Sequence, residues 1–250
     1  MAQGKFIDKT GETNINNQGL KMTIIKYYNS GNITIKFEDG SIRNNIQYSH
    51  FKNGQVKSLF YPTLCGIGYI GETNTHENNK QLKSYKCWMN MLKRCYSEAY
   101  QKRQPTYKDC VVCDEWLCYA NFKKWYEKHY YKLDNERVEL DKDILVKGNK
   151  IYSPNNCIFV PKIINSLFST HDRMDDLPIG VKKQDKGYMA RIRIDGKLKY
   201  LGYYETPEKA FYAYKEAKEK EIKRVADLYK DKIPQELYEA MYNYEVEITD

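Results

Sequence analysis

Residues 179–217 read IGVKKQDKGYMARIRIDGKLKYLGYYETPEKAFYAYKEA, and this stretch decides how the C-terminal part of the chain folds. Its pattern predicts three short strands followed by one amphipathic helix. Alternate residues of a strand point to opposite faces, so the middle strand places Arg191 and Arg193 on one face. The other face receives the apolar residues Ala190, Ile192 and Ile194. A small sheet with basic residues on one side and a helix on the other suits contact with a DNA groove.

The charge balance permits binding to a polyanion without requiring it. The 250 residues include 41 Lys and Arg against 33 Asp and Glu, for a formal net charge of +8. This excess suits nucleic acid, and it equally suits a lysine-rich soluble protein. No run approaches the ~18 apolar residues that a membrane span needs, and the first residues lack the apolar core of a secretion signal. We therefore expect a cytoplasmic protein whose seven cysteines are reduced.

The chain divides into segments of different character. Residues 19–71 contain strand-like runs separated by short turns rich in Asn, Asp and Gly, which predicts a small β-barrel-like module. The polar residues that follow, 71–81, have the composition of a linker. We predict an α+β multidomain protein with a small all-β module plus linker, a middle domain, a sheet-and-helix domain and a C-terminal helix with a tail, over residues 1–80, 81–170, 177–232 and 233–250.

The middle and C-terminal segments mix helices with strands. Residues 88–95 and 116–126 carry apolar side chains at helical spacing. Residues 138–160 predict a hairpin that turns at 147–150, and a short helix that includes Ile163 and Ile164 follows it. A long helix is expected from Pro207 to Lys230, since proline is favoured at the first helical position. One more helix is expected over 234–244.

Four motifs follow one another in the C-terminal stretch: Gly180-Val181-Lys182, Tyr188–Arg193, Tyr200–Tyr204 and Thr206–Tyr214. Together they resemble the DNA-binding domain of the plant APETALA2/ethylene-response-factor family, over residues 178–220. That family has G-V-R, W-A-A-E-I-R, W-L-G-T-F and T-A-E-E-A-A-x-A-Y at these places, and the module also occurs in phage and mobile-element proteins. The resemblance implies a three-stranded antiparallel sheet that packs on a helix and lies in the major groove of double-stranded DNA.

The same resemblance implies which residues contact DNA. In the family, Arg and Trp side chains on the outer face of the sheet contact bases and phosphates. Carried over to this chain, the contacting positions are Lys182, Arg191, Arg193 and Tyr200, with Lys183 as a nearby phosphate contact. Arg193 suits a bidentate bond to guanine, whereas the lysines supply charge. Arg191 stands where the family has Glu, and Leu198 stands where it has Arg, so the family's base preference does not transfer.

A second set of motifs lies in the middle of the chain, over Leu140–Leu145, Tyr152–Pro161 and Ile163–Asn165. It resembles the HNH ββα-metal endonucleases, in a form associated with phage homing-endonuclease-like proteins. In that family D-H ends one strand, N-N-x-x-N-L opens the helix segment, and a further N or H follows. The resemblance implies a His that activates water, and a carboxylate that holds one divalent metal ion together with a second His or an Asn.

Carried over to this chain, the candidate catalytic residues are Asp141, Lys142, Asp143 and Asn156, and the candidate ligands of Mg²⁺ or a similar ion are Asp141, Asp143 and Asn165. Lys142 stands where the family has its general-base His. A lysine acts as a base only when burial or positive charge lowers its pKa by several units, and adjacent aspartates have the opposite effect. The resemblance therefore implies a metal site that lacks the usual base. The alternative is a hairpin with a solvated Asp-Lys-Asp and an Asn cap.

The cysteines allow two interpretations. Cys110 and Cys113 have the spacing of zinc ligands, but a second pair with this spacing is missing. Most of the other cysteines lie among apolar residues, where cysteine behaves as a small hydrophobe. The first interpretation is a structural zinc site at Cys110 and Cys113. The second is that these cysteines are buried as small hydrophobic residues.

Three functional hypotheses follow. The first is a sequence-directed DNA-binding protein of the homing-endonuclease type, whose C-terminal sheet selects the site that the middle domain cuts. The second is a non-catalytic DNA-binding regulator, in which the middle domain is a scaffold or a second DNA clamp. The third is a basic phage factor that acts on a host protein in the bacterial cytoplasm. None of them requires a membrane.

Overall fold

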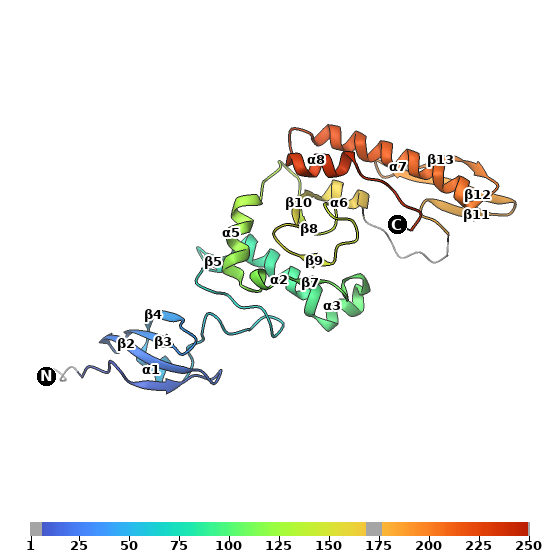
Figure 1. Cartoon of the computed structure of the whole chain (residues 1–250). Coiled ribbons are helices and arrows are strands. Elements are labelled where there is room, and N and C mark those ends of the chain that lie inside the picture. Colours follow the sequence, from blue (N-terminus) through green and yellow to red (C-terminus); the bar gives the residue numbers. More distant parts are fainter. Residues whose placement is uncertain (1–6, 169–176, 250) are drawn as a thin grey trace. The chain divides into compact units, whose positions relative to one another are not determined.

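The computed structural model describes residues 7–168 and 177–249. The architecture is mixed α and β, with several small sheets and helices that alternate along the chain (Figure 1). One compact unit contains the described residues up to Lys128 together with Ile151–Ser153. A second unit contains His129–Lys150 and the described residues from Pro154 onward.

The N-terminal residues form a four-stranded antiparallel sheet in the order β1-β2-β3-β4. Its core includes Met22, Ile24 and Ile35, which are fully buried together with Phe51 of the following helix. No pairing of β1 with β4 occurs among the described residues, so the expected barrel-like module is an open sheet. The elements are β1 (Thr13–Ile15), β2 (Lys21–Asn29), β3 (Asn32–Phe37), β4 (Ile42–Ile46) and α1 (Tyr48–Lys52).

The remainder of the first unit is helical and is organised around buried aromatic side chains. Trp88 and Trp116 are fully buried, and the indole Nε1 of Trp88 donates a hydrogen bond to the Trp116 carbonyl oxygen at 2.7 Å. The rings of Trp116 and Trp125 lie 4.7 Å apart between centroids. The elements are β5 (His76–Glu77), β6 (Lys80–Gln81), α2 (Lys83–Tyr96), α3 (Glu98–Arg103), the 3₁₀ helix η1 (Pro105–Tyr107), β7 (Val111–Val112), α4 (Asp114–Leu117) and α5 (Tyr119–His129).

The predicted hairpin over 138–160 forms, but its two strands are joined by a long connection. Strand β8 (Val138–Asp141) pairs antiparallel with β10 (Ile158–Pro161), and α6 (Lys162–Phe168) follows directly. The connection contains the expected turn, because the Asn149 N–H donates to the Val146 carbonyl oxygen at 3.0 Å and Gly148 has a φ of 75°. This turn does not join paired strands, since the β9 strand that follows (Ile151–Tyr152) pairs in parallel with β7 of the first unit. Tyr152 is buried there and hydrogen-bonds to Arg94, which explains why this part of the connection leaves the hairpin.

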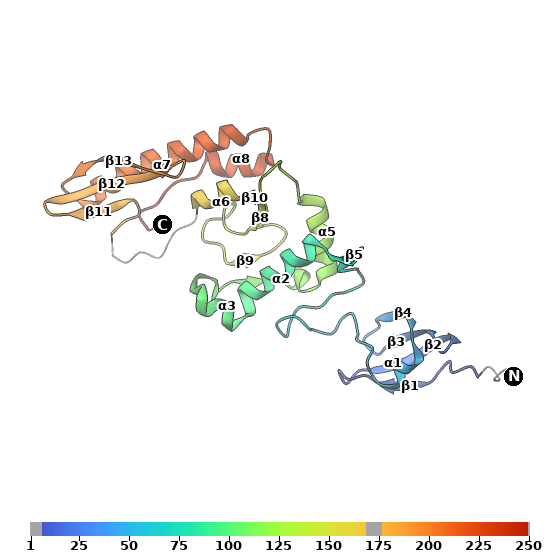
Figure 2. The ribbon, with the colours of Figure 1, turned by 180° about the vertical axis from the view of Figure 1, so that it is seen from behind.

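The C-terminal residues form a three-stranded antiparallel sheet in the order β11-β12-β13, covered by a long helix. The strands are β11 (Val181–Gln184), β12 (Gly187–Ile194) and β13 (Lys197–Tyr204). The helix α7 (Pro207–Tyr229) runs along the sheet, and α8 (Gln235–Tyr242) packs on α7; the view from behind shows the same arrangement (Figure 2). The Thr206 side chain caps α7 by accepting a hydrogen bond from the Lys209 N–H, as the Thr-Pro signal predicts.

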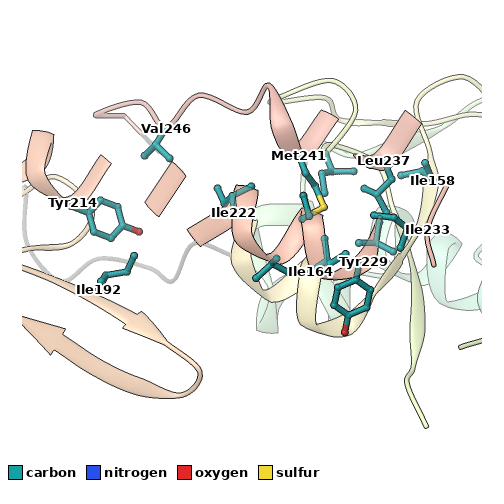
Figure 3. Close-up of a cluster of buried hydrophobic side chains, with 14 of the residues drawn as sticks. Ile158, Ile164, Ile192, Tyr214, Ile222, Tyr229, Ile233, Leu237, Met241 and Val246 are labelled. Atoms are coloured by element: carbon teal, nitrogen blue, oxygen red, sulfur yellow. The ribbon is translucent and has the colours of Figure 1, made fainter. Parts of the chain in front are cut away.

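One hydrophobic cluster joins the parts of the second unit. Figure 3 shows Ile158 of β10 and Ile164 of α6 in the same cluster as Leu237 and Met241 of α8. The cluster extends to Ile192 of the three-stranded sheet. The segment β8-β10-α6 therefore packs with the C-terminal residues, and the compact units cut across the ranges 81–170 and 177–232 drawn from the sequence.

Candidate nucleic-acid interface

The turn between β12 and β13 fixes the register of the C-terminal sheet. Asp195 and Gly196 form a two-residue turn in which both φ angles are positive, 48° and 75°. Asp-Gly is a preferred sequence for such a turn, whose twist matches that of the flanking strands. The resulting register places Arg193 opposite Leu198 and Arg191 opposite Tyr200. Residues directly opposite each other in a sheet project from the same face.

The inner face of this sheet is closed by α7. Ala190 and Ile192 are buried, as alternation along β12 predicts, and Val181 of β11 is buried beside them. Ile192 and Tyr214 of α7 are drawn in the same part of the core in Figure 3. Ala210, which is fully buried, is small enough to let the helix lie close to the strands.

The opposite face, here called the outer sheet face, is open to solvent. It is formed by Lys182, Met189, Arg191, Arg193, Leu198, Tyr200 and Tyr203. The three large side chains of β13 are substantially exposed: Leu198 by 55%, Tyr200 by 64% and Tyr203 by 47%. Strand alternation predicted Arg191 and Arg193 here, and the APETALA2 resemblance implied Lys182 and Tyr200. Neither identified Tyr203 as a member of this face, because a bulge at Ala190/Arg191 shifts the pairing between β12 and β13.

Lys183 differs from the other predicted DNA contacts. It is exposed, but it pairs with Tyr188, whose side chain packs against the core on the helix side of the sheet. Alternation therefore directs Lys183 away from the outer sheet face. It stays a predicted phosphate contact, at the margin of the sheet rather than on the face that carries Lys182.

The cations of the outer sheet face are available to a ligand. Within residues 7–168 and 177–249, Lys182, Arg191 and Arg193 form no ion pair. The Arg193 guanidinium donates one hydrogen bond to the Gly196 carbonyl oxygen at 3.1 Å, which orients it along the turn. The turn itself is held to α7, because Arg224 bonds to Asp195 at 3.0 Å and to the buried Glu221 at 2.7 Å. The hairpin is therefore anchored while its arginines face solvent.

The second candidate site lies at the end of β8. The Asp141 Oδ1 atom accepts hydrogen bonds from the backbone N–H groups of Asp143 at 2.9 Å and Ile144 at 2.8 Å. Burial, and then the charge of the neighbouring Asp143, raise the pKa of the Asp141 carboxyl group to about 6. In this arrangement Asp141 closes the turn that follows the strand.

Lys142 is buried, with a side chain that is only 9% exposed. Its ammonium group lies 2.9 Å from the Asp143 Oδ2 atom. An ammonium group in an ion pair has no free electron pair, so this arrangement does not suit a general base. At the position where the HNH resemblance would place a His, Lys142 therefore does not supply the chemistry of a base.

The two asparagines of the motif have different partners. The Asn156 side chain donates to Asn149 Oδ1 at 3.2 Å, and Asn149 donates to the Lys142 carbonyl oxygen at 2.6 Å. This chain of bonds links Asn156 to the connection that follows β8. Asn165 of α6 instead donates to the Glu139 Oε2 atom at 3.2 Å, and Glu139 also pairs with Arg137.

The candidate ligands of a divalent ion each have another partner in this arrangement. One Asp141 oxygen accepts backbone N–H groups, one Asp143 oxygen faces the Lys142 ammonium group, and Asn165 donates to Glu139. The Asp141 and Asp143 carboxyl groups also lie within hydrogen-bonding reach of each other. A Mg²⁺ site needs oxygen ligands that converge at about 2.1 Å. In the described part of the chain, no three His, Cys, Asp or Glu side chains come together as a metal-binding group.

The surroundings of the cysteine pair bear on the predicted zinc site. Cys110 is buried and its thiol contacts the Thr106 carbonyl oxygen at 3.9 Å. Burial raises the pKa of the Cys113 thiol, which disfavours the thiolate that zinc binds. Cys110 is therefore packed as a small hydrophobe, whereas Cys113 is only partly buried.

Comparison with known proteins adds no identity, since no family model, curated protein or solved structure matches the chain. None of the helices in the described residues has both the length and the apolar character that crossing a membrane would need.

Proposed function

We propose that this protein binds double-stranded DNA in a sequence-directed way, through the outer sheet face. The observation that carries the proposal is this face itself, where Lys182, Arg191 and Arg193 stand beside the exposed Leu198, Tyr200 and Tyr203. A monomeric protein rarely exposes several large apolar side chains together on one strand unless the surface has a ligand. Cations that flank apolar and aromatic groups match a polyanion whose bases lie between two lines of phosphate.

The dimensions of the sheet support the major groove as its place of binding. The major groove is about 12 Å wide, and it admits a two-stranded ribbon such as the β12–β13 hairpin. Each arginine can donate two hydrogen bonds to guanine, whereas the hydroxyl group of Tyr200 can bond to phosphate. The hairpin is anchored to α7 through Arg224, so little conformational freedom is lost when its face docks.

Substitution of Arg193 by alanine tests this function. The target is a duplex that the wild-type protein selects from a random pool, and affinity is measured by fluorescence anisotropy. We expect Arg193→Ala to weaken binding by about 1–3 kcal/mol, roughly 5- to 150-fold, because one bidentate base contact is lost. Lys220→Ala is the matched control, since it removes one positive charge from an exposed position of α7. If both variants lose the same amount of affinity, binding depends only on general attraction between charges. That outcome would contradict sequence-directed binding.

The segment β8-β10-α6 serves in this proposal as a scaffold for the DNA-binding sheet. Its order of strand, strand and helix agrees with the ββα resemblance, which makes DNA cleavage the second candidate function. The ion pair of Lys142 with Asp143 and the bond of Asn165 to Glu139 favour binding without cleavage. The non-catalytic regulator is therefore the form of the proposal that the contacts support best.

Plasmid nicking separates the two candidates. We expect supercoiled plasmid to stay intact with the protein in Mg²⁺, Mn²⁺ or Ca²⁺, because the candidate ligands have other partners and Lys142, at the position of the expected base, is ion-paired with Asp143. A commercial nuclease in the same buffers shows that the metals are active. Nicking by the wild-type protein that disappears in both Asp141→Ala and Asp143→Ala would overturn this expectation and restore the endonuclease hypothesis.

A further inference from the structure

Leu198 has an unusual position for a leucine. It is 55% exposed, and it lies on the outer sheet face directly opposite Arg193. On the proposed DNA-binding surface, this leucine is therefore the cross-strand neighbour of Arg193, the side chain suited to guanine. Leu198 is not among the residues of the hydrophobic cluster of this unit, so packing within the described residues does not account for a leucine at this position.

The hydrogen-bond pattern shows how close the two side chains are. The Arg191 N–H donates to the Gly180 carbonyl oxygen, which lies on the side away from β13. Arg191 and Tyr200 are thus a pair without mutual hydrogen bonds, and Arg193 and Leu198, two residues further along, are another. Side chains in such pairs start about 4.5–5.5 Å apart. This spacing is somewhat larger than the rise of about 3.4 Å between neighbouring base pairs, so two side chains of this pair can reach adjacent base pairs.

The chemistry of leucine restricts the base that it can face. In the major groove, the C5 methyl of thymine is the apolar group that a base pair presents, whereas the other edges present donors and acceptors. A leucine placed against those polar edges removes water from them without replacing its hydrogen bonds. Against thymine, the same side chain buries a methyl group.

We propose that Leu198 is a specificity residue that contacts the C5 methyl of a thymine next to the base contacted by Arg193. The proposal rests on the proposed DNA-binding function and makes it more specific: the preferred target contains a guanine and a thymine at neighbouring base pairs. Leu198 supplies the apolar half of this readout, and Arg193 supplies the hydrogen-bonding half.

Replacement of thymine by deoxyuridine tests this inference, because it removes only the C5 methyl group. Each thymine of the selected duplex is replaced in turn, and affinity is measured for the wild-type protein and for Leu198→Ala. We expect one position beside a guanine at which the wild type loses about fourfold, the effect of burying one methyl group. Leu198→Ala is expected to bind the two duplexes equally at that position.

Leu228→Ala is the matched control, because Leu228 is a leucine of similar exposure, 57%, on α7. It is expected to keep the wild-type response to deoxyuridine. The inference is overturned if no deoxyuridine position changes binding by the wild type, or if Leu198→Ala responds as the wild type does. Binding to no duplex of the random pool would instead reject the proposed function, and the inference with it.

Discussion

Replacement of Gly180 by alanine is expected to lower the free energy of unfolding of the C-terminal unit by about 2–5 kcal/mol. Gly180 has a φ of +78°, a conformation that costs an alanine roughly 1–2 kcal/mol. A Cβ atom at this position would lie 2.0 Å from the Cδ2 atom of Tyr214, whose ring is buried against the sheet. Moving that ring costs a further 1–3 kcal/mol or so, typical of an overpacked core.

The matched control for this variant is Gly196→Ala. Gly196 has nearly the same φ, +75°, but nothing lies within 4 Å of the position that its Cβ would occupy. Its loss is therefore expected to be limited to the backbone cost of roughly 1–2 kcal/mol. Urea denaturation followed by circular dichroism measures both variants. Equal losses would mean that Tyr214 yields without cost, and that the close contact of Gly180 with the helix is unimportant for stability.

Local signals made the C-terminal sheet predictable. Strand alternation alone placed Ala190 and Ile192 inside and Arg193 outside, since each side chain's face depends only on its position along β12. The start of α7 was equally local, because the Thr206 cap and the proline after it act within one turn. The exposed face could therefore be expected before any tertiary contact was known.

Long-range contacts made the middle of the chain less predictable. Asn165 donates a hydrogen bond to Glu139, and no spacing in the sequence distinguishes Glu139 from Asp141, which projects from the same side of β8. The pairing of β9 with β7 joins residues about 40 positions apart, so the residues after the turn at 147–150 do not pair with β8 as a hairpin there would require. Sequence patterns identify helices and strands, but tertiary packing determines which strands pair and which side chains bond to each other.

A substitution in the hydrophobic core of the second unit is also expected to lower its free energy of unfolding strongly. Ile164→Ala is expected to destabilise the unit by about 2–5 kcal/mol, because Ile164 is fully buried in the cluster that includes α7 and α8. Its neighbour on α6, Ile163, is 52% exposed, so Ile163→Ala is expected to change stability by less than about 0.5 kcal/mol. Urea denaturation of the two variants measures this difference.

Hydrogen exchange then shows whether the unit opens as one body. If one core holds β8-β10-α6 and the three-stranded sheet together, Ile164→Ala should reduce the exchange protection of β10 and of β12 by similar free energies. Loss of protection in β10 alone would show that 81–170 and 177–232 unfold independently, as the sequence-based ranges predict. In that case the sheet would be a separate DNA-binding module, and α7 would depend on the sheet rather than on α6 for its stability.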